Sequence, residues 1–138
     1  MQWDDSENAG FTTGLPWKRV NPNYTEINVA TQDGDPNSVL NHFRKMTRLR
    51  NDNLVLVYGD YDLILDDHDQ IYAYTRTLND DNLLVIMNFS DERANATLPN
   101  TVRTGEIMIN NYSSEPFKDN SQALLEPYQA VVVRLQKR

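Results

Sequence analysis

The sequence predicts a mainly β protein: an antiparallel β-sandwich preceded by a long irregular segment and one helix. Short apolar runs recur about every ten residues from residue 54 onward, with no helical pattern between them. A single apolar stripe with helical spacing precedes these runs. Residues 1–36 show no sustained period of either kind. The 138 residues are enough for one domain with a flanking piece.

A helix is expected over residues 37–53. Asp35 is a suitable N-cap, and Pro36 suits the first helical position because its missing N–H would be unpaired there. The stripe repeats at helical spacing and comprises Val39, Leu40, Phe43, Met46 and Leu49. Asn51, Asp52 and Asn53 provide a plausible end to the helix.

Strands are predicted through the remainder of the chain. Residues 61–65 and 71–77 alternate around a polar turn at 66–69, which indicates a hairpin. The continuous apolar run 83–89 is typical of a central strand covered on both faces. Shorter strands are expected at 94–98, 106–110, 123–125 and 129–135, while 54–58 is a strand or a short irregular lead-in.

Composition excludes several classes of function. The 20 acidic and 13 basic residues give a net charge of −7, which argues against binding a nucleic-acid backbone. No apolar run approaches the roughly 20 residues that span a bilayer, and no secretory signal is recognisable. The absence of cysteine excludes disulfides, thiolate zinc sites and cysteine nucleophiles, and favours a cytoplasmic location.

The residues themselves provide no catalytic set, no metal site and no cofactor site. His42 and His68 lack the partner spacing of a metal motif, so we interpret them as a helix-surface residue and a turn residue. Residues 33–37 begin like a calcium loop, but Ser38 and Arg44 occupy the positions of its glycine and its bidentate acid. The Asn-x-Ser/Thr triplets at Asn23, Asn88, Asn95 and Asn111 are interpreted as chance matches.

Aromatic residues occur at intervals in the irregular N-terminal segment, at Trp3, Phe11, Trp17 and Tyr24. One interpretation is sugar stacking, because aromatic faces complement the C–H faces of pyranoses. The other is that these side chains are hydrophobic anchors which pin a long loop to a neighbouring surface. The pattern alone favours the anchors.

The chain also resembles a known protein family, most specifically in its N-terminal segment. The stretches that carry it are Met1–Gly14, Pro16-Trp17, Val20–Tyr24, Glu26–Val29, Asp35–Val39, Leu49-Arg50, Val57–Tyr61, Tyr72–Leu78 and Asn88–Ser90. With them the chain resembles the C-terminal third of bacterial α-glucosidases of the oligo-1,6-glucosidase type, in glycoside hydrolase family thirteen. The resemblance spans essentially all 138 residues and is most specific in the first 29.

This resemblance implies that residues 1–53 are a remnant of a catalytic (β/α)8 barrel, its long last loop and last helix, and that residues 54–138 are the C-terminal β-sandwich. The family's nucleophile Asp, acid/base Glu and third Asp belong to an earlier part of such a chain. We therefore expect a structural buttress without activity of its own, derived from a retaining enzyme of short α-1,6-linked glucosides. Gln2, Trp3 and Asp4 would begin a loop close to the sugar pocket.

The implied partners are the catalytic barrel of the same polypeptide and, in the parent enzyme, an oligosaccharide. The family also includes dextran glucosidases, trehalose-6-phosphate hydrolases and sucrose-isomerising enzymes, and the sequence does not choose among them. A free-standing carbohydrate-binding sandwich, with Trp17, Tyr72 and Tyr74 as stacking residues, is the alternative. Because the helical stripe would lack its barrel, we also expect the chain to self-associate at high concentration.

Overall fold

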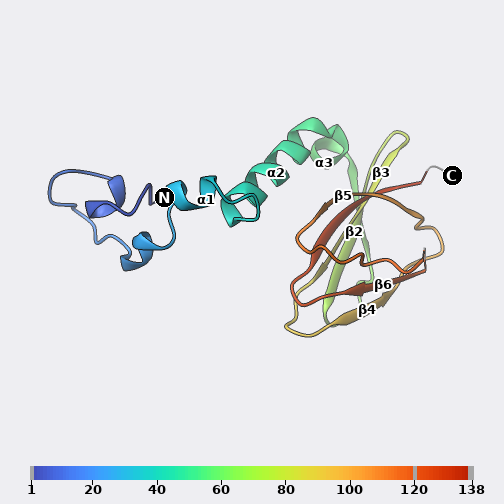
Figure 1. Ribbon diagram of the computed structural model, residues 1–138. Coiled ribbons are helices and arrows are strands. Elements are labelled where there is room, and N and C mark those ends of the chain that lie inside the picture. Colours follow the sequence, from blue (N-terminus) through green and yellow to red (C-terminus); the bar gives the residue numbers. More distant parts are fainter. Residues whose placement is uncertain (1, 120, 137–138) are drawn as a thin grey trace. The chain divides into compact units, whose positions relative to one another are not determined.

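The computed structural model describes residues 2–119 and 121–136, so Met1, where the resemblance begins, lies outside the described residues. The chain divides into two compact units, Met1–Arg48 and Leu49–Arg138. Figure 1 shows the loops and short helices of the first and the strands of the second.

The first unit contains more regular structure than the sequence predicts. Two 3-10 turns, η1 (Glu7–Gly10) and η2 (Pro22–Thr25), are followed by a short helix, α1 (Val29–Asp33). The expectation that residues 1–36 are irregular throughout is therefore wrong at α1. Asn28 starts this helix because its side-chain oxygen accepts a hydrogen bond from the Thr31 backbone at 2.8 Å.

The long helix α2 (Val39–Asp52) begins later than predicted. Asp35 does not cap it, because its carboxylate accepts from the Asn37 backbone in a turn before the helix. Ser38 is the N-cap of α2 instead, because its hydroxyl oxygen accepts a hydrogen bond from the Asn41 backbone at 3.2 Å. None of the α2 residues is buried.

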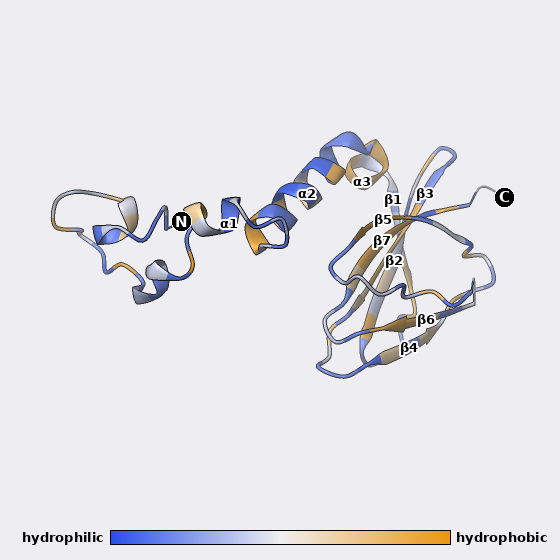
Figure 2. Ribbon diagram, viewed as in Figure 1, coloured by the Kyte–Doolittle hydropathy of each residue, from blue (hydrophilic) through white to orange (hydrophobic). Residues whose placement is uncertain are grey.

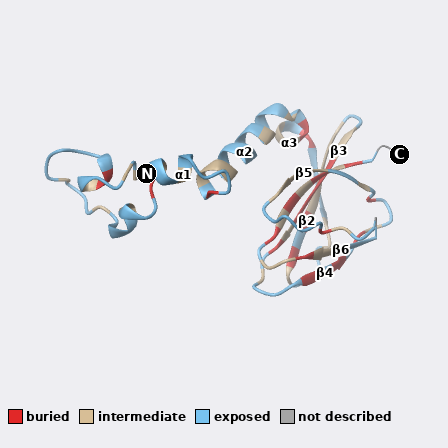
Figure 3. Ribbon diagram, viewed as in Figure 1, coloured by how far each residue is buried: buried red, intermediate tan, exposed pale blue. Residues whose placement is uncertain are grey.

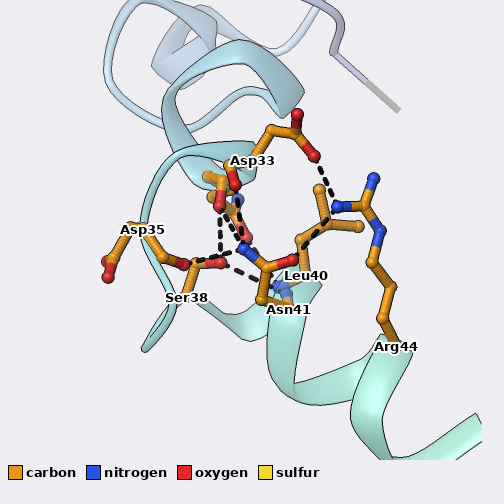
Figure 4. Close-up of polar contacts among 7 residues, drawn as sticks. Asp33, Asp35, Ser38, Leu40, Asn41 and Arg44 are labelled. Carbon is orange, nitrogen blue, oxygen red and sulfur yellow. Dashed lines mark hydrogen bonds and ion pairs between the residues drawn. The ribbon is translucent and has the colours of Figure 1, made fainter. Parts of the chain in front are cut away.

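Side chains on α2 connect this helix to the preceding turn, as Figure 4 shows. The Asn41 amide donates to the carbonyl oxygens of Asp33, at 3.1 Å, and Asp35, at 2.8 Å. Arg44 forms an ion pair with Asp33 and also donates to the Asn41 side-chain oxygen at 3.0 Å. The bond from Asn41 to Asp33 satisfies a carbonyl group at the end of α1, which has no partner within that helix.

The second unit is a two-layer β structure, as predicted. A five-stranded antiparallel sheet has the order β1-β2-β3-β7-β5, and a separate two-stranded sheet pairs β4 with β6. The strands are β1 (Asp60–Ile64), β2 (Ile71–Leu78), β3 (Asp81–Asn88), β4 (Ala94–Thr97), β5 (Thr104–Asn110), β6 (Gln122–Leu125) and β7 (Ala130–Leu135). The expected hairpin is the β1–β2 pair, with Leu63 opposite Tyr74.

The core lies between the two sheets, and Figures 2 and 3 show apolar and buried residues concentrated along the strands. Its larger side chains include Leu84, Ile86, Leu98, Leu125, Val131 and Val133. Small alanines of β4 and β6 face them, which lets the short sheet approach closely. Each large side chain stabilises the fold by roughly 1.5–3 kcal/mol when fully buried.

The residues 54–58 form a helix, α3 (Leu54–Tyr58), which corrects the expected strand or irregular lead-in. Tertiary packing explains the difference. Val55 is almost fully buried, and α3 packs on β2 and β3. Arg76 of β2 donates to the carbonyl oxygens of Val55 and Val57, which satisfies the end of the helix.

Buried polar side chains tie the strand ends together. The Asn88 amide donates to the carbonyl oxygens of Glu92 and Glu126, at 2.7 and 3.0 Å. Gln129, fully buried, accepts from the Glu126 backbone and donates to the Asn110 side chain. Asn88 is thus a satisfied core amide, in agreement with the interpretation of its triplet as a chance match.

Candidate functional site

The sequence candidates Gln2, Trp3 and Asp4 lie at the N-terminus of α1. The carbonyl oxygens of Gln2 and Trp3 accept from the backbone N–H groups of Val29 and Ala30, at 2.9 and 3.0 Å. These are N–H groups of the first helical turn, which have no partner within the helix. The start of the chain and α1, more than twenty residues apart in sequence, are thereby held together.

The side chains of Gln2 and Asp4 are committed to this local structure. The Gln2 amide donates to the Asn23 side chain at 2.9 Å and to the Ile27 carbonyl at 2.8 Å. The Asp4 carboxylate accepts from the Ser6 backbone at 3.0 Å and from the Ser6 hydroxyl. Both residues therefore position the loop, and their polar groups are already partnered.

Trp3 differs from its two neighbours. Its backbone is fixed on both sides, because its N–H donates to the Ala9 carbonyl at 2.9 Å and its own carbonyl binds Ala30. The residue nevertheless remains 54% exposed. Of the three candidates, Trp3 is the one that presents a free side chain on a rigid backbone.

A tight turn supports this arrangement. Asn8, Ala9 and Gly10 all have positive φ angles, and Ala9 is fully buried. At Gly10, φ is +72° and an added Cβ would lie 3.0 Å from the Asp4 carboxylate oxygens, so this position favours glycine. The Asn-Ala-Gly sequence gave little indication of this turn, because alanine rarely adopts positive φ.

An open groove of about 460 Å³ lies beside Gln2. Its walls combine aromatic and aliphatic side chains with two cationic ones, and it is lined by Gln2, Phe11, Thr12, Pro16, Trp17, Lys18, Arg19, Val20 and Asn21. Trp17 is 89% exposed, with the Lys18 ammonium 4.5 Å from its ring centre. Phe11 is also exposed, so these aromatics do not anchor the loop within this unit; polar bonds hold it instead.

The two histidines lie in different units. His42 is on α2, and His68 is in the β1–β2 turn. His68 is more than a surface residue: Nδ1 accepts from the Gln70 and Ile71 backbones, and Nε2 is 2.9 Å from the Asn95 carbonyl. Since Nδ1 accepts, Nε2 carries the proton and donates, which fastens the turn to β4.

Among residues 2–119 and 121–136, no group of three or more His, Cys, Asp or Glu side chains is placed to hold a metal ion. Over the same residues, no helix combines the length and apolar character needed to cross a membrane.

The alternative sugar-stacking residues Trp17, Tyr72 and Tyr74 belong to separate units, Trp17 to Met1–Arg48 and the tyrosines to Leu49–Arg138. Tyr72 and Tyr74 form part of an aromatic surface on the side of the large sheet away from the core. We call this surface the tyrosine face and define it as Tyr61, Leu63, Tyr72, Tyr74 and Phe89.

The hydroxyl groups of Tyr61 and Tyr72 lie 2.6 Å apart. This hydrogen bond, above all, raises the pKa of Tyr61 to about 12. Burial raises the pKa of the Tyr74 hydroxyl, against the opposing effect of Arg76. The Tyr61 and Tyr74 phenols thus ionise only in more alkaline solution than an ordinary tyrosine, and Arg76 is paired in register with Tyr61 at the edge of this face.

Two families match consecutive parts of the chain. The family described as Alpha amylase, catalytic domain, matches residues 1–59. The Alpha-amylase SusG C-terminal domain matches residues 71–132.

Individual relatives match nearly the whole chain. The oligo-1,6-glucosidase of Parageobacillus thermoglucosidasius is 47% identical over 137 residues, covering 98% of this chain and 24% of the relative. The glucan 1,6-alpha-glucosidase of Streptococcus pneumoniae serotype 4 is 38% identical, covering 98% of this chain and 24% of the relative.

A similar solved structure is that of an isomaltulose synthase variant from Erwinia rhapontici NX5, determined with D-glucose. It has a TM-score of 0.90 and 43% identity, covering 98% of this chain and 24% of that one. The chain thus spans about a quarter of the length of these relatives.

Proposed function

The chain belongs to the α-amylase superfamily, in glycoside hydrolase family thirteen, and we propose that it is the C-terminal part of a retaining α-glucosidase that hydrolyses short α-1,6-linked glucosides. The observation that carries this proposal is the 47% identity to an oligo-1,6-glucosidase over 98% of the chain. Residues 1–53 would be the last loop and helix of the catalytic barrel, and residues 54–138 the sandwich that supports it.

In this proposal the chemistry belongs to the preceding part of the polypeptide. A retaining glycosidase uses two carboxyl groups about 5–5.5 Å apart, one as the nucleophile and one as the acid and base. We assign neither role to a residue of this chain. Its contribution is to fix the last barrel loop, through the bonds of Gln2 and Trp3 to α1.

We further propose that the loop of Gln2, Trp3 and Asp4 borders the sugar pocket, with Trp3 offering its indole to the substrate and the other two positioning it. Active sites of such barrels are formed by the loops that follow the strands. The location proposed for the parent enzyme is the cytoplasm.

The test replaces the corresponding last quarter of the Parageobacillus thermoglucosidasius enzyme with residues 1–138, giving a full-length chimera. We expect the chimera to hydrolyse isomaltose and p-nitrophenyl α-glucoside. The isolated chain should not exceed a mock preparation, because nucleophile and acid are supplied elsewhere. Activity that tracks the isolated chain through purification would refute the proposal.

A variant pair tests the loop. Trp3→Ala in the chimera should raise KM for isomaltose about tenfold, the loss expected for one aromatic contact of roughly 1–1.5 kcal/mol. Asp5→Asn is the matched control, since Asp5 is exposed in the same loop. Equal KM values for both variants would show that Trp3 does not border the pocket.

A further inference from the structure

The groove beside Gln2 is formed by a loop that hydrogen bonds hold at both ends. At one end the Asn8 amide donates to the Thr12 carbonyl oxygen at 3.2 Å. At the other end the Asn21 side chain accepts from the Asn23 backbone at 3.3 Å, and the Gln2 amide donates to the Asn23 side chain at 2.9 Å. The walls of the groove are therefore fixed before a ligand arrives, which lowers the entropy cost of binding.

The groove concentrates the positive charge of this part of the chain. Residues 1–36 contain two basic residues, Lys18 and Arg19, and both line the groove. None of the six acidic residues of the same stretch is among the described residues that line it; they are Asp4, Asp5, Glu7, Glu26, Asp33 and Asp35. The whole chain has a net charge of −7, so its overall field repels anions. The groove is thus a local site at which an anion is attracted.

Both cationic side chains are accessible to a ligand. Lys18 and Arg19 are exposed, and neither forms an ion pair within residues 2–119 and 121–136. The Lys18 ammonium lies 4.5 Å from the centre of the Trp17 ring. Because this contact is with the ring face, the ammonium N–H groups remain able to donate to oxygen atoms. A phosphate group suits this pair, since its oxygens accept several charge-assisted hydrogen bonds.

The other wall residues indicate what carries the anionic group. Trp17 is 89% exposed and Phe11 is 49% exposed, and with Pro16 they give the groove apolar surface beside its cations. An aromatic face complements the C–H face of a pyranose ring. The volume of about 460 Å³ falls within the range of small-molecule sites. A monosaccharide phosphate offers both an apolar ring face and an anionic group.

We propose that this groove binds a monosaccharide phosphate, with the phosphate against Lys18 and Arg19 and the pyranose ring against Trp17. The inference rests on the proposed function in one respect: a neutral α-1,6-linked glucoside has no group that needs the two cations. The bound sugar phosphate is therefore a ligand that the enzyme neither consumes nor releases, and it occupies the loop that carries Trp3. Because the cations are exposed, the binding is sensitive to salt.

Titrations of the isotope-labelled 138-residue chain, followed by NMR, test this proposal. The signals are the Trp17 indole N–H and the backbone amides of Lys18 and Arg19. Glucose 6-phosphate is the probe, and it should bind about tenfold more tightly than glucose, because it adds charge-assisted hydrogen bonds. It should bind about threefold more tightly than inorganic phosphate, which has no ring to stack on Trp17. Added salt should weaken its binding.

Variants separate the two halves of the site. Lys18→Gln and Arg19→Gln should each weaken binding of glucose 6-phosphate about fivefold and leave binding of glucose unchanged. Trp17→Ala should reduce the affinity for glucose 6-phosphate to that for inorganic phosphate. Lys45→Gln is the matched control, because Lys45 is an exposed base of the same unit that does not line the groove. An unchanged amide signal of Val29, which donates to the start of the loop, verifies that each variant keeps its structure.

Equal affinities for glucose and glucose 6-phosphate would overturn the proposal, as would an equal loss of binding in Lys45→Gln and Lys18→Gln. Inorganic phosphate that binds as tightly as glucose 6-phosphate would refute the saccharide, and tighter binding of adenosine monophosphate would identify a nucleotide site instead. The chimera described above is titrated by calorimetry and assayed for isomaltose hydrolysis on the same sample. Hydrolysis without binding would refute the sugar-phosphate site alone, and binding without hydrolysis would refute the proposed function alone.

Discussion

Replacement of Gly59 by alanine should destabilise the sandwich by wedging apart α3 and the edge of the sheet. Gly59 follows the last residue of α3, and its N–H donates to the Val55 carbonyl at 3.0 Å. A Cβ at this position would lie 2.5 Å from that same carbonyl oxygen and 3.0 Å from the Thr77 carbonyl oxygen. Both are backbone atoms in packed elements, so neither can rotate away.

The loss of unfolding free energy caused by Gly59→Ala can be estimated from the contacts that must be relieved. Relief of an overlap in a packed site costs about 1–3 kcal/mol, and weakening of the Val55 hydrogen bond costs about 0.5–1.5 kcal/mol. The smaller conformational freedom of unfolded alanine returns about 0.4–1 kcal/mol. Backbone strain adds nothing, since φ is −63°. The expected net loss of unfolding free energy is about 1–3 kcal/mol.

Urea unfolding measures this loss, with the near-ultraviolet circular dichroism of tyrosine as the signal. Every tyrosine except Tyr24 lies in Leu49–Arg138, whereas both tryptophans lie in Met1–Arg48 and report the other unit. With a urea m-value of about 1–3 kcal/mol/M, the tyrosine midpoint of Gly59→Ala should fall by roughly 1 M. Gly34→Ala is the control, because no atom lies within 4 Å of its added Cβ. Identical midpoints for Gly59→Ala and the wild type would refute the steric argument.

Three further predictions concern the isolated chain. Because the pKa of Tyr61 is raised to about 12, its stabilising effect is complete below the ordinary value near 10 and is lost as pH rises from 10 to 12; Tyr61→Phe should flatten this alkaline loss in urea titrations. Phe43, 65% exposed on α2, should promote self-association, so Phe43→Glu should lower the dimer fraction in light scattering, and a monomer at millimolar concentration would contradict this. Limited proteolysis should cut within residues 1–34 earlier than within β3, because Ala9 and Asn28 are the only buried residues among the described residues 2–34. Early cuts within β3 would contradict this prediction.

The sandwich was predictable because its signals are local. Alternation along β1 and β2, and the continuous apolar run of β3, placed these strands within about two residues of their observed bounds. Register was not predicted, because β3 is apolar on both faces and its pattern does not distinguish Leu84 and Ile86 from Leu83 and Val85.

The helices were predicted less well because distant residues decide them. Asp35 and Ser38 are both good caps, and the choice between them depends on α1: the Ser38 hydroxyl donates to the Gln32 carbonyl at 2.7 Å, which holds it at the start of α2. The β-branched stretch of α3 favours a strand locally, but burial of Val55 and the bonds from Arg76 make it a helix. Neither contact can be inferred from the neighbouring sequence.

The candidate site shows the same division. The family resemblance identified Gln2, Trp3 and Asp4 as a group with one role. The hydrogen bonds separate two positioning side chains, Gln2 and Asp4, from the exposed Trp3. The pattern favoured Phe11 and Trp17 as anchors on a neighbouring surface, and in Met1–Arg48 both side chains are exposed.

Both units have large apolar side chains that are exposed to solvent. In Met1–Arg48, polar bonds define the loop in detail, while Trp3, Phe11 and Trp17 remain about half exposed or more. In Leu49–Arg138, a complete core coexists with a second apolar face that α3 covers at one end. A free-standing binding module would use the exposed apolar face of the sheet, but it would not need the hydrogen-bonded loop of Met1–Arg48. The C-terminal piece of a larger enzyme that we propose would account for both, since the rest of such an enzyme offers apolar surface to cover them.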